Sequence, residues 1–142
     1  MDERLSWFVE NRVVWVTPRK VTTIESLTED NERITKMIRA AFAATDLPVH
    51  VIIDGSVMGT QPSPLEGRKL LTYINEPGMG YRIVAGIGNP SHHFFSTFVG
   101  KQRPGTSLVM STIEQALSTL TLKDDTLPDM LSLYRAARKG DE

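Results

Sequence analysis

The chain has 142 residues, with 16 Lys and Arg against 17 Asp and Glu, so its formal net charge is −1, and it contains no cysteine. This length fits one ordinary domain with a buried core, and 40% hydrophobic and 23% charged residues indicate a globular rather than a disordered chain. The near-zero charge argues against a dedicated nucleic-acid binder, which needs a basic excess to displace counterions. The lack of cysteine excludes disulfides, thiol nucleophiles, iron–sulfur clusters and Cys-ligated zinc.

The N-terminus and the hydropathy pattern indicate neither a leader nor a membrane span. Residues 1–4 read Met-Asp-Glu-Arg, without the positively charged first region of a signal peptide. No apolar stretch approaches the ~20 residues that a bilayer-spanning helix needs. We therefore expect a soluble cytoplasmic protein with no membrane insertion.

Two β-rich runs open the chain. Residues 5–9 and 13–17 contain aromatic and β-branched side chains, and the polar residues 10–12 between them are typical of a short turn. Pro18 ends the second run, because proline has no amide hydrogen to donate to a sheet. These features predict a β-hairpin.

A helix and a buried strand are predicted next. Apolar residues recur at helical spacing over about residues 28–44, and acidic residues fall in the first turns, where the helix dipole favours them. The apolar positions are Ile34, Met37, Ile38, Ala41 and Phe42. Residues 49–54 are almost continuously apolar and end in Asp54, which is typical of a central strand buried on both faces.

A helix-start signal follows a loop over residues 55–62. The hydroxyl of Ser63 can cap the helix, Pro64 occupies the first helical position, and Glu66 lies three residues after the cap. The pattern predicts a helix that continues to about residue 74. Its inner face is expected to comprise Gly67, Leu70, Leu71 and Ile74.

Strands and helices alternate through the following region. Strands are predicted over residues 81–87 and 106–110, and helices over residues 90–99 and 112–122. Apolar residues of the first of these helices are expected to pack inward: Phe94, Phe95, Phe98 and Val99.

The composition becomes polar after Leu122 and then turns amphipathic. We therefore predict a domain over residues 1–122 and a helical C-terminal extension over residues 123–142, packed on the domain or extending it. The complete order is β-β-α-β-α-β-α-β-α with a C-terminal helix. A leading hairpin followed by alternating βα units predicts an α/β fold with a mixed sheet, parallel over most of its width.

Residues 5–122 resemble the STAS domains of sulfate transporters and anti-sigma-factor antagonists, which have the SpoIIAA-like fold. The resemblance rests on the opening hairpin, on the segment 49–54 that is similar to the family's strand ending in Asp, and on the loop that leads to the cap at Ser63. It implies a non-enzymatic regulatory module that binds proteins, of the kind represented by anti-sigma-factor antagonists.

In that family the loop carries an Asp-Ser-Ser-Gly or Asp-Ser-Thr-Gly motif, whose first Ser or Thr is phosphorylated by a partner kinase. Ser63 falls at about the corresponding position, but the sequence here reads Gln61-Pro62-Ser63-Pro64, without the preceding Asp and the following Gly. The chain is more similar to the STAS/SEC14-like branch, which often lacks the motif and of which some members are thought to bind apolar ligands.

The candidate site is the loop of residues 55–66 with the adjoining helix. Ser63 is the first candidate phospho-acceptor, because phosphate at a helix N-terminus meets the positive end of the dipole, and the alternative role for its hydroxyl is the helix cap alone. Ser56 and Thr60 are further candidate acceptors. The surface offered to a kinase or another regulator is expected to include Asp54, Gly55, Met58 and Glu66.

A second hypothesis is a carrier or sensor of a small apolar or anionic ligand, bound between the sheet and the helices that follow Ser63 and Pro90. Five aromatic residues could line such a pocket or a dimer surface: Trp7, Trp15, Phe94, Phe95 and Phe98. A homodimer through the hairpin or the C-terminal helix is a further hypothesis.

Catalytic and metal sites are not expected. His92 and His93 are adjacent and would point about 100° apart on a helix, and His50 is distant, so we expect these histidines to be surface or half-buried residues without a metal. A phospho-accepting Asp54 of the receiver type would need an acidic pair after the first strand, where Thr17 and Pro18 stand. We predict no catalytic residue and no cofactor.

Overall fold

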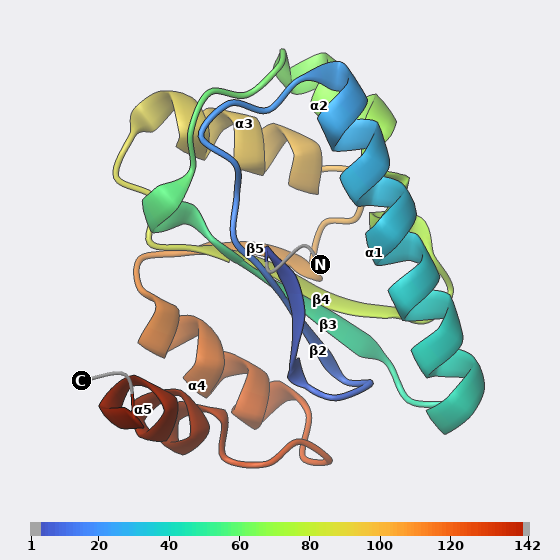
Figure 1. The fold of residues 1–142 in the computed structure, drawn as a ribbon, viewed down its shortest axis with the longest axis vertical. Coiled ribbons are helices and arrows are strands. Elements are labelled where there is room, and N and C mark those ends of the chain that lie inside the picture. The colour runs from blue at the N-terminus through green and yellow to red at the C-terminus, as the bar shows by residue number, and fades with distance from the viewer. Residues whose placement is uncertain (1–3, 141–142) are drawn as a thin grey trace.

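The computed structural model describes residues 4–140 and has an α/β architecture with a five-stranded mixed sheet (Figure 1). The strands are β1 (Leu5–Val9), β2 (Val13–Val16), β3 (Val49–Asp54), β4 (Met79–Ala85) and β5 (Ser107–Met110). The helices are α1 (Ile24–Thr45), α2 (Pro64–Leu70), α3 (Pro90–Gly100), α4 (Ile113–Lys123) and α5 (Met130–Gly140), with short 3₁₀ turns η1 (Gly55–Val57) and η2 (Thr72–Asn75). The predicted fold class and element order are confirmed.

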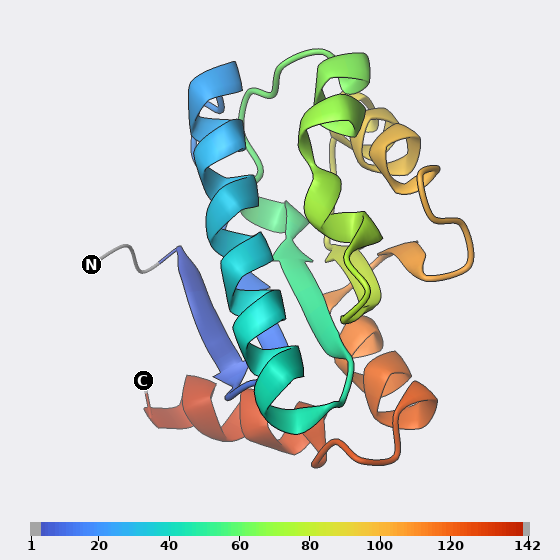
Figure 2. The ribbon, with the colours of Figure 1, turned by 90° about the vertical axis from the view of Figure 1, so that its right-hand side faces the viewer.

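The strands follow one another across the sheet in the order β1-β2-β3-β4-β5. The β1–β2 hairpin is antiparallel, and each later pair is parallel. Parallel crossovers are right-handed, so a sheet that always grows in the same direction carries all its crossover helices on one face. Helices α1, α2 and α3 form that layer, and α4 and α5 cover the opposite face (Figures 1 and 2).

The central strand β3 separates two apolar clusters. Val49 and Val51 pack with α1, α2 and α3, whereas Ile52 packs with α4 and α5. Residues 49–53 are all buried, as the sequence predicts. Successive strand side chains point to opposite faces, so a strand in the middle layer must be apolar on both.

Helix α1 begins at Ile24, four residues before the predicted start. Thr23 and Ser26 form a reciprocal capping box, in which each side chain accepts a hydrogen bond from the other residue's backbone N–H. The prediction missed this start because Ser26 occupies the position where Glu or Gln is expected. The helix ends at Asp46 in the left-handed conformation.

Helix α2 ends at Leu70 and does not continue to residue 74 as predicted. The chain turns into η2, where the backbone N–H of Tyr73 donates to the side-chain oxygen of Asn31 on α1 over 2.9 Å. A side chain from another helix thus replaces the intrahelical acceptor. Gly67 permits close packing of α2 on α3, since a Cβ there would lie 2.6 Å from the Phe95 ring.

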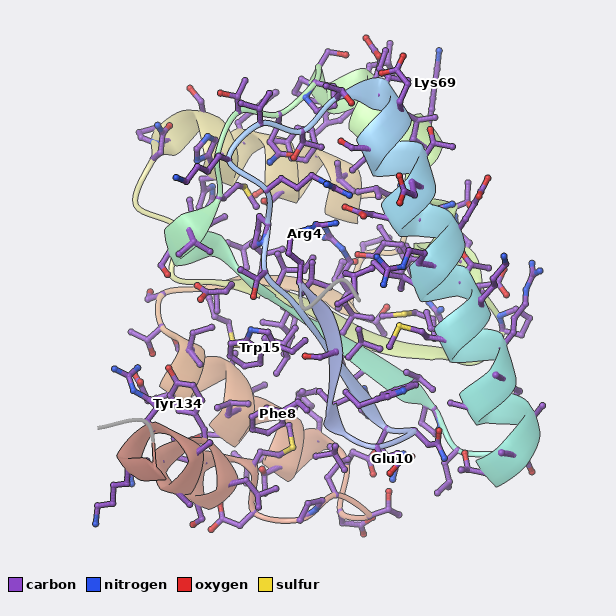
Figure 3. All side chains as sticks on the ribbon, viewed as in Figure 1. Arg4, Phe8, Glu10, Trp15, Lys69 and Tyr134 are labelled. Atoms are coloured by element: carbon purple, nitrogen blue, oxygen red, sulfur yellow. The ribbon has the colours of Figure 1, made fainter. Side chains whose placement is uncertain are left out.

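The C-terminal segment packs on the sheet and on α4. Leu127 and Met130 are buried in the same cluster as Ile52. The rings of Phe8, Trp15 and Tyr134 form a continuous stack that joins the hairpin to α5, with centroid distances of 5.5 and 5.9 Å (Figure 3). Within residues 4–140, no helix is both long and apolar enough to cross a membrane.

Candidate functional site

The carboxyl ends of the parallel strands meet the loops at the left of the molecule in Figure 1, and α/β folds place their binding sites at this end of the sheet. Asp54 ends β3 and accepts hydrogen bonds from the Ser56 backbone N–H over 3.0 Å and from the Ser56 hydroxyl over 2.5 Å. The two residues satisfy each other and start η1, and Gly55 between them is buried. Asp54 therefore shapes the loop.

The loop of residues 55–63 is held by backbone contacts to the segment before α1. The Thr60 N–H donates to the Lys20 carbonyl over 2.9 Å, and the Thr60 carbonyl accepts from the Thr22 N–H over 2.8 Å. Gly59 is required here, because a Cβ would collide with the Lys20 backbone. Met58 packs against the core. The candidate surface thus has a defined backbone.

The three candidate phospho-acceptors differ in their environments. Ser63 is exposed, and its hydroxyl oxygen accepts a hydrogen bond from the Glu66 N–H over 3.2 Å, as predicted for an N-cap. Thr60 is exposed, whereas the exposed Ser56 already donates its hydroxyl to Asp54. Glu66 is half-buried next to the cap. The structure brings Ser63 and Thr60 to one loop, and phosphorylation of either stays a prediction.

An apolar groove of about 720 Å³ lies between this loop and α3. Its walls are residues 60–62 and Pro64 on one side, and residues 90–92, Phe94 and Phe95 on the other. Phe94 is 60% exposed, so the prediction that it packs inward was wrong. Neighbouring helical residues point about 100° apart, and the core position is taken by Phe95.

Further exposed apolar side chains surround this end of the molecule. Leu65 and Val57 are exposed on α2 and η1, and Val21 is exposed next to its bridge partner Thr60. Phe98 is half-buried, with the Arg68 guanidinium 5.4 Å from its ring centroid. Several exposed apolar side chains at one end of a protein are typical of interaction sites when they form a common patch.

The cavity between the sheet and α1 is smaller than a ligand pocket. A cavity of about 60 Å³ lies there, lined by apolar residues together with Arg19, Asp30, Tyr73 and Arg82. Ligand sites for organic molecules measure about 300–1,000 Å³. An apolar ligand in the interior, one form of the second hypothesis, would require the helices to move apart.

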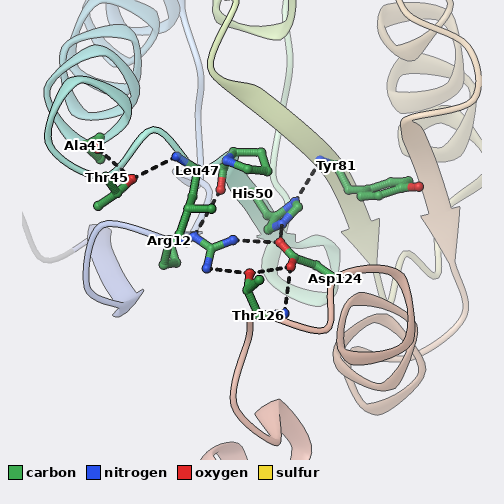
Figure 4. Close-up of polar contacts among 9 residues, drawn as sticks. Arg12, Ala41, Thr45, Leu47, His50, Tyr81, Asp124 and Thr126 are labelled. Carbon is green, nitrogen blue, oxygen red and sulfur yellow. Dashed lines mark hydrogen bonds and ion pairs between the residues drawn. The ribbon is translucent and has the colours of Figure 1, made fainter.

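A buried polar network at the opposite end of the sheet was missed by the sequence analysis (Figure 4). His50 is 2% exposed and lies between two partners: its Nδ1 accepts from the Tyr81 N–H over 2.9 Å, so its Nε2–H donates to Asp124 over 2.8 Å. Arg12 donates to the same carboxylate over 2.6 Å and to the Thr126 hydroxyl over 2.9 Å. The predicted surface or half-buried setting of His50 is therefore wrong. Arg12 lies in the turn that the sequence predicts, but its side chain is buried.

The environment of this network favours the neutral form of His50 and the charged form of Asp124. Burial lowers the pKa of His50 below 6.5, and this effect exceeds the opposing influence of Asp124. Desolvation raises the pKa of Asp124, but hydrogen bonds from His50 and Thr126 and the charge of Arg12 outweigh it and lower that pKa to about 2. Both ring nitrogens of His50 are occupied, so the network stabilises the fold and offers no free base.

The other two histidines lie at the start of α3. His92 is half-buried in the groove wall, and His93 is exposed, with its Nδ1 3.5 Å from the Thr97 hydroxyl. In the described part of the chain, no three His, Asp or Glu side chains form a group that could hold a metal ion.

Comparison of the chain with protein-family models, with curated proteins and with solved structures finds no match.

Proposed function

We propose that this chain is a cytoplasmic, non-enzymatic regulatory module of the STAS type, which binds a protein partner in the apolar groove. The main observation behind the proposal is that Phe94 is exposed beside the groove. The opposite wall of the groove is a loop that contains Pro62 and Pro64, and backbone hydrogen bonds fix the conformation of this loop. The architecture is consistent with the SpoIIAA-like fold that the sequence resemblance implies.

A protein partner is favoured by the shape and chemistry of the groove. Aromatic side chains dominate the binding energy of protein interfaces, and they do so in pockets that exclude water. Phe94 supplies such a side chain, and Pro62, Pro64 and Pro90 supply rigid apolar walls that lose little conformational entropy on binding. We propose that an apolar segment of the partner fills this groove.

Ser63 provides a means of regulating that contact. It stands between Pro62 and Pro64, which both line the groove, and its neighbour across the cap is Glu66. A phosphate on Ser63 would keep acceptor oxygens at the N-terminus of α2, and it would place negative charge beside the Glu66 carboxylate and the apolar wall. We propose that a partner kinase phosphorylates Ser63 and thereby releases the bound segment.

The experiment is partner capture with matched variants. Immobilised wild-type protein, a Phe94→Ser variant and a Leu122→Ser control are exposed to extract of the source cells, and captured proteins are cross-linked and mapped. Leu122 is 86% exposed on α4, at the opposite face of the sheet. We expect a partner that is retained by the control, is lost at least about tenfold with Phe94→Ser, and cross-links to α2 or α3. Equal capture by Phe94→Ser and wild type would contradict the proposal.

A further inference from the structure

Arg82 is a buried arginine without a carboxylate partner. It lies in the middle of β4, is 4% exposed, and donates through Nε to the hydroxyl of buried Tyr73 over 2.8 Å. The side-chain ion pairs of the described residues involve Asp30, Glu76 and Asp124, and none involves Arg82. Within residues 4–140 its two terminal amino groups make no hydrogen bond.

Two buried hydroxyl groups lie in the same cleft as this guanidinium. Ser96, 1% exposed on α3, and Ser107, the register partner of Arg82 on β5, have side-chain oxygens that are buried without a hydrogen-bond partner among the described residues. Together with Arg82 they line a cleft of about 340 Å³ beneath α3. The side chains of Lys101 and His93 line the same cleft and are exposed.

The guanidinium of Arg82 and the hydroxyls of Ser96 and Ser107 can all donate to a hydrogen-bond acceptor placed in this cleft. A buried guanidinium is costly unless an anion or several acceptors surround it, and buried hydroxyls in folded proteins nearly always have partners. No acidic residue lines the cleft, whereas two permanent cations, Arg82 and Lys101, do. An anion with several oxygens would accept from the guanidinium, the ammonium and both hydroxyls at once.

We propose that the cleft beneath α3 binds a phosphate group, either as the free ion or as a small phosphomonoester. Two cations match a dianion, and the tetrahedral oxygens accept from donors that approach from β4, β5 and α3. The cleft exceeds the volume of one phosphate, and its walls include Pro104, Leu108 and Val109, which suit a small organic group. This site is separate from the apolar groove and does not depend on the proposed partner.

Calorimetric titration of the full chain with inorganic phosphate tests the site, with glycerol phosphate as the phosphomonoester and chloride at equal ionic strength as the control. We expect saturable binding of one phosphate or phosphomonoester per chain, an increase in Tm with either, and neither effect with chloride. Tighter binding of glycerol phosphate than of phosphate would identify the monoester as the preferred form, and the reverse would identify the free ion.

Three variants locate the binding. Arg82→Met removes the charge while keeping an apolar stem, and we expect affinity to fall more than tenfold. Since this change also affects the core, Ser96→Ala serves as the second variant. The Ser96 hydroxyl makes no hydrogen bond within residues 4–140, so we expect unchanged stability and an affinity lower by about three- to tenfold. Arg68→Gln, which removes an arginine that lies over Phe98, is the matched control and should bind as wild type.

Two results would overturn the proposal. One is the absence of saturable binding by wild type up to about 10 mM of either phosphate compound, a concentration about tenfold above a Kd of 1 mM. The other is binding that neither Arg82→Met nor Ser96→Ala weakens, which would place the anion elsewhere on the surface.

Discussion

The two faces of the sheet are covered in different ways. On the α4–α5 face, the buried Arg12 pairs with the partly buried Asp124, and His50 has a partner on each ring nitrogen. On the α1–α3 face lie all the buried side-chain nitrogen and oxygen atoms that have no hydrogen-bond partner among residues 4–140: Arg19 Nε, Thr35 Oγ1, Ser96 Oγ and Ser107 Oγ. The same face carries the apolar groove and Arg82, which donates to Tyr73 and has no ion-pair partner among residues 4–140.

This difference is the basis for both of our proposals, which place binding on the α1–α3 face. Polar groups that are left without partners in a folded protein are expected where a ligand or a partner supplies them. On the α4–α5 face, the polar side chains of Arg12 and His50 bind the start of the C-terminal segment at Asp124. The α1–α3 face keeps donors and apolar side chains available, and both proposals concern that face.

The largest expected effect is on the α4–α5 face. Asp124→Ala would leave the Arg12 guanidinium buried and uncompensated, and we expect the free energy of unfolding to fall by about 4 kcal/mol in urea titrations. Asp125→Ala, an exposed neighbour, is the control and should change it by less than about 0.5 kcal/mol. Similar values for the two variants would show that the network does not hold the segment.

The second-largest effect is expected when a buried side chain of α5 is shortened. Met130→Ala should destabilise the protein by about 3 kcal/mol, because it opens a cavity at a fully buried side chain. Leu133→Ala on the same helix removes a 44% exposed side chain and should cost less than about 1 kcal/mol. If both variants have the same midpoint of urea unfolding as the wild type, α5 is not part of the core in solution.

The pH dependence of stability should report the same network. The folded-state pKa of His50 lies below its ordinary 6.5, so the unfolded chain takes up the proton first, and stability falls as pH decreases below about 6.5. The pKa of Asp124 is lowered from 3.8 to about 2, so a further contribution on the order of 2 kcal/mol is present above pH 4 and is lost between pH 4 and pH 2. Urea unfolding at a series of pH values measures both, and Asp124→Asn should flatten the acidic part.

A smaller effect is expected at the candidate phospho-acceptor. Ser63→Ala removes the side-chain acceptor of the Glu66 N–H and should cost about 1 kcal/mol, whereas Ser63→Asp keeps an acceptor and should cost less. Thermal unfolding measures the difference. If Ser63→Ala leaves the stability unchanged, the hydroxyl is not engaged in the cap.

The smallest effect on stability is expected at the groove. Phe94→Ser should change the free energy of unfolding by less than about 0.5 kcal/mol, because the ring is mostly exposed, while Phe95→Ala should cost about 3 kcal/mol in the core. Chemical denaturation of the pair checks this contrast. A large loss with Phe94→Ser would indicate that its ring stabilises the fold and is not reserved for a partner.

Most of the element order could be predicted from sequence because strands and helices leave periodic patterns. The buried run of residues 49–54 and the cap at Ser63 are local signals, and both are confirmed. The predicted helix to residue 74 was wrong because Asn31, more than forty positions away, provides the acceptor that redirects the chain. The loop of the candidate site and its hydroxyl groups could be predicted from the sequence. The exposure of Phe94 and the cleft around Arg82 could not.

Charge and composition by themselves determined that this chain lacks cysteine chemistry and carries a nearly balanced set of charges, and periodicity determined an α/β order of elements. Only the tertiary structure decided which charges are buried. Arg12 pairs with Asp124 across 112 positions of the sequence, and Arg82, Ser96 and Ser107 line one cleft only because α3 lies over β4 and β5. Periodicity reports which face of an element is apolar, but the partner of a buried polar group is set by the packing of distant elements.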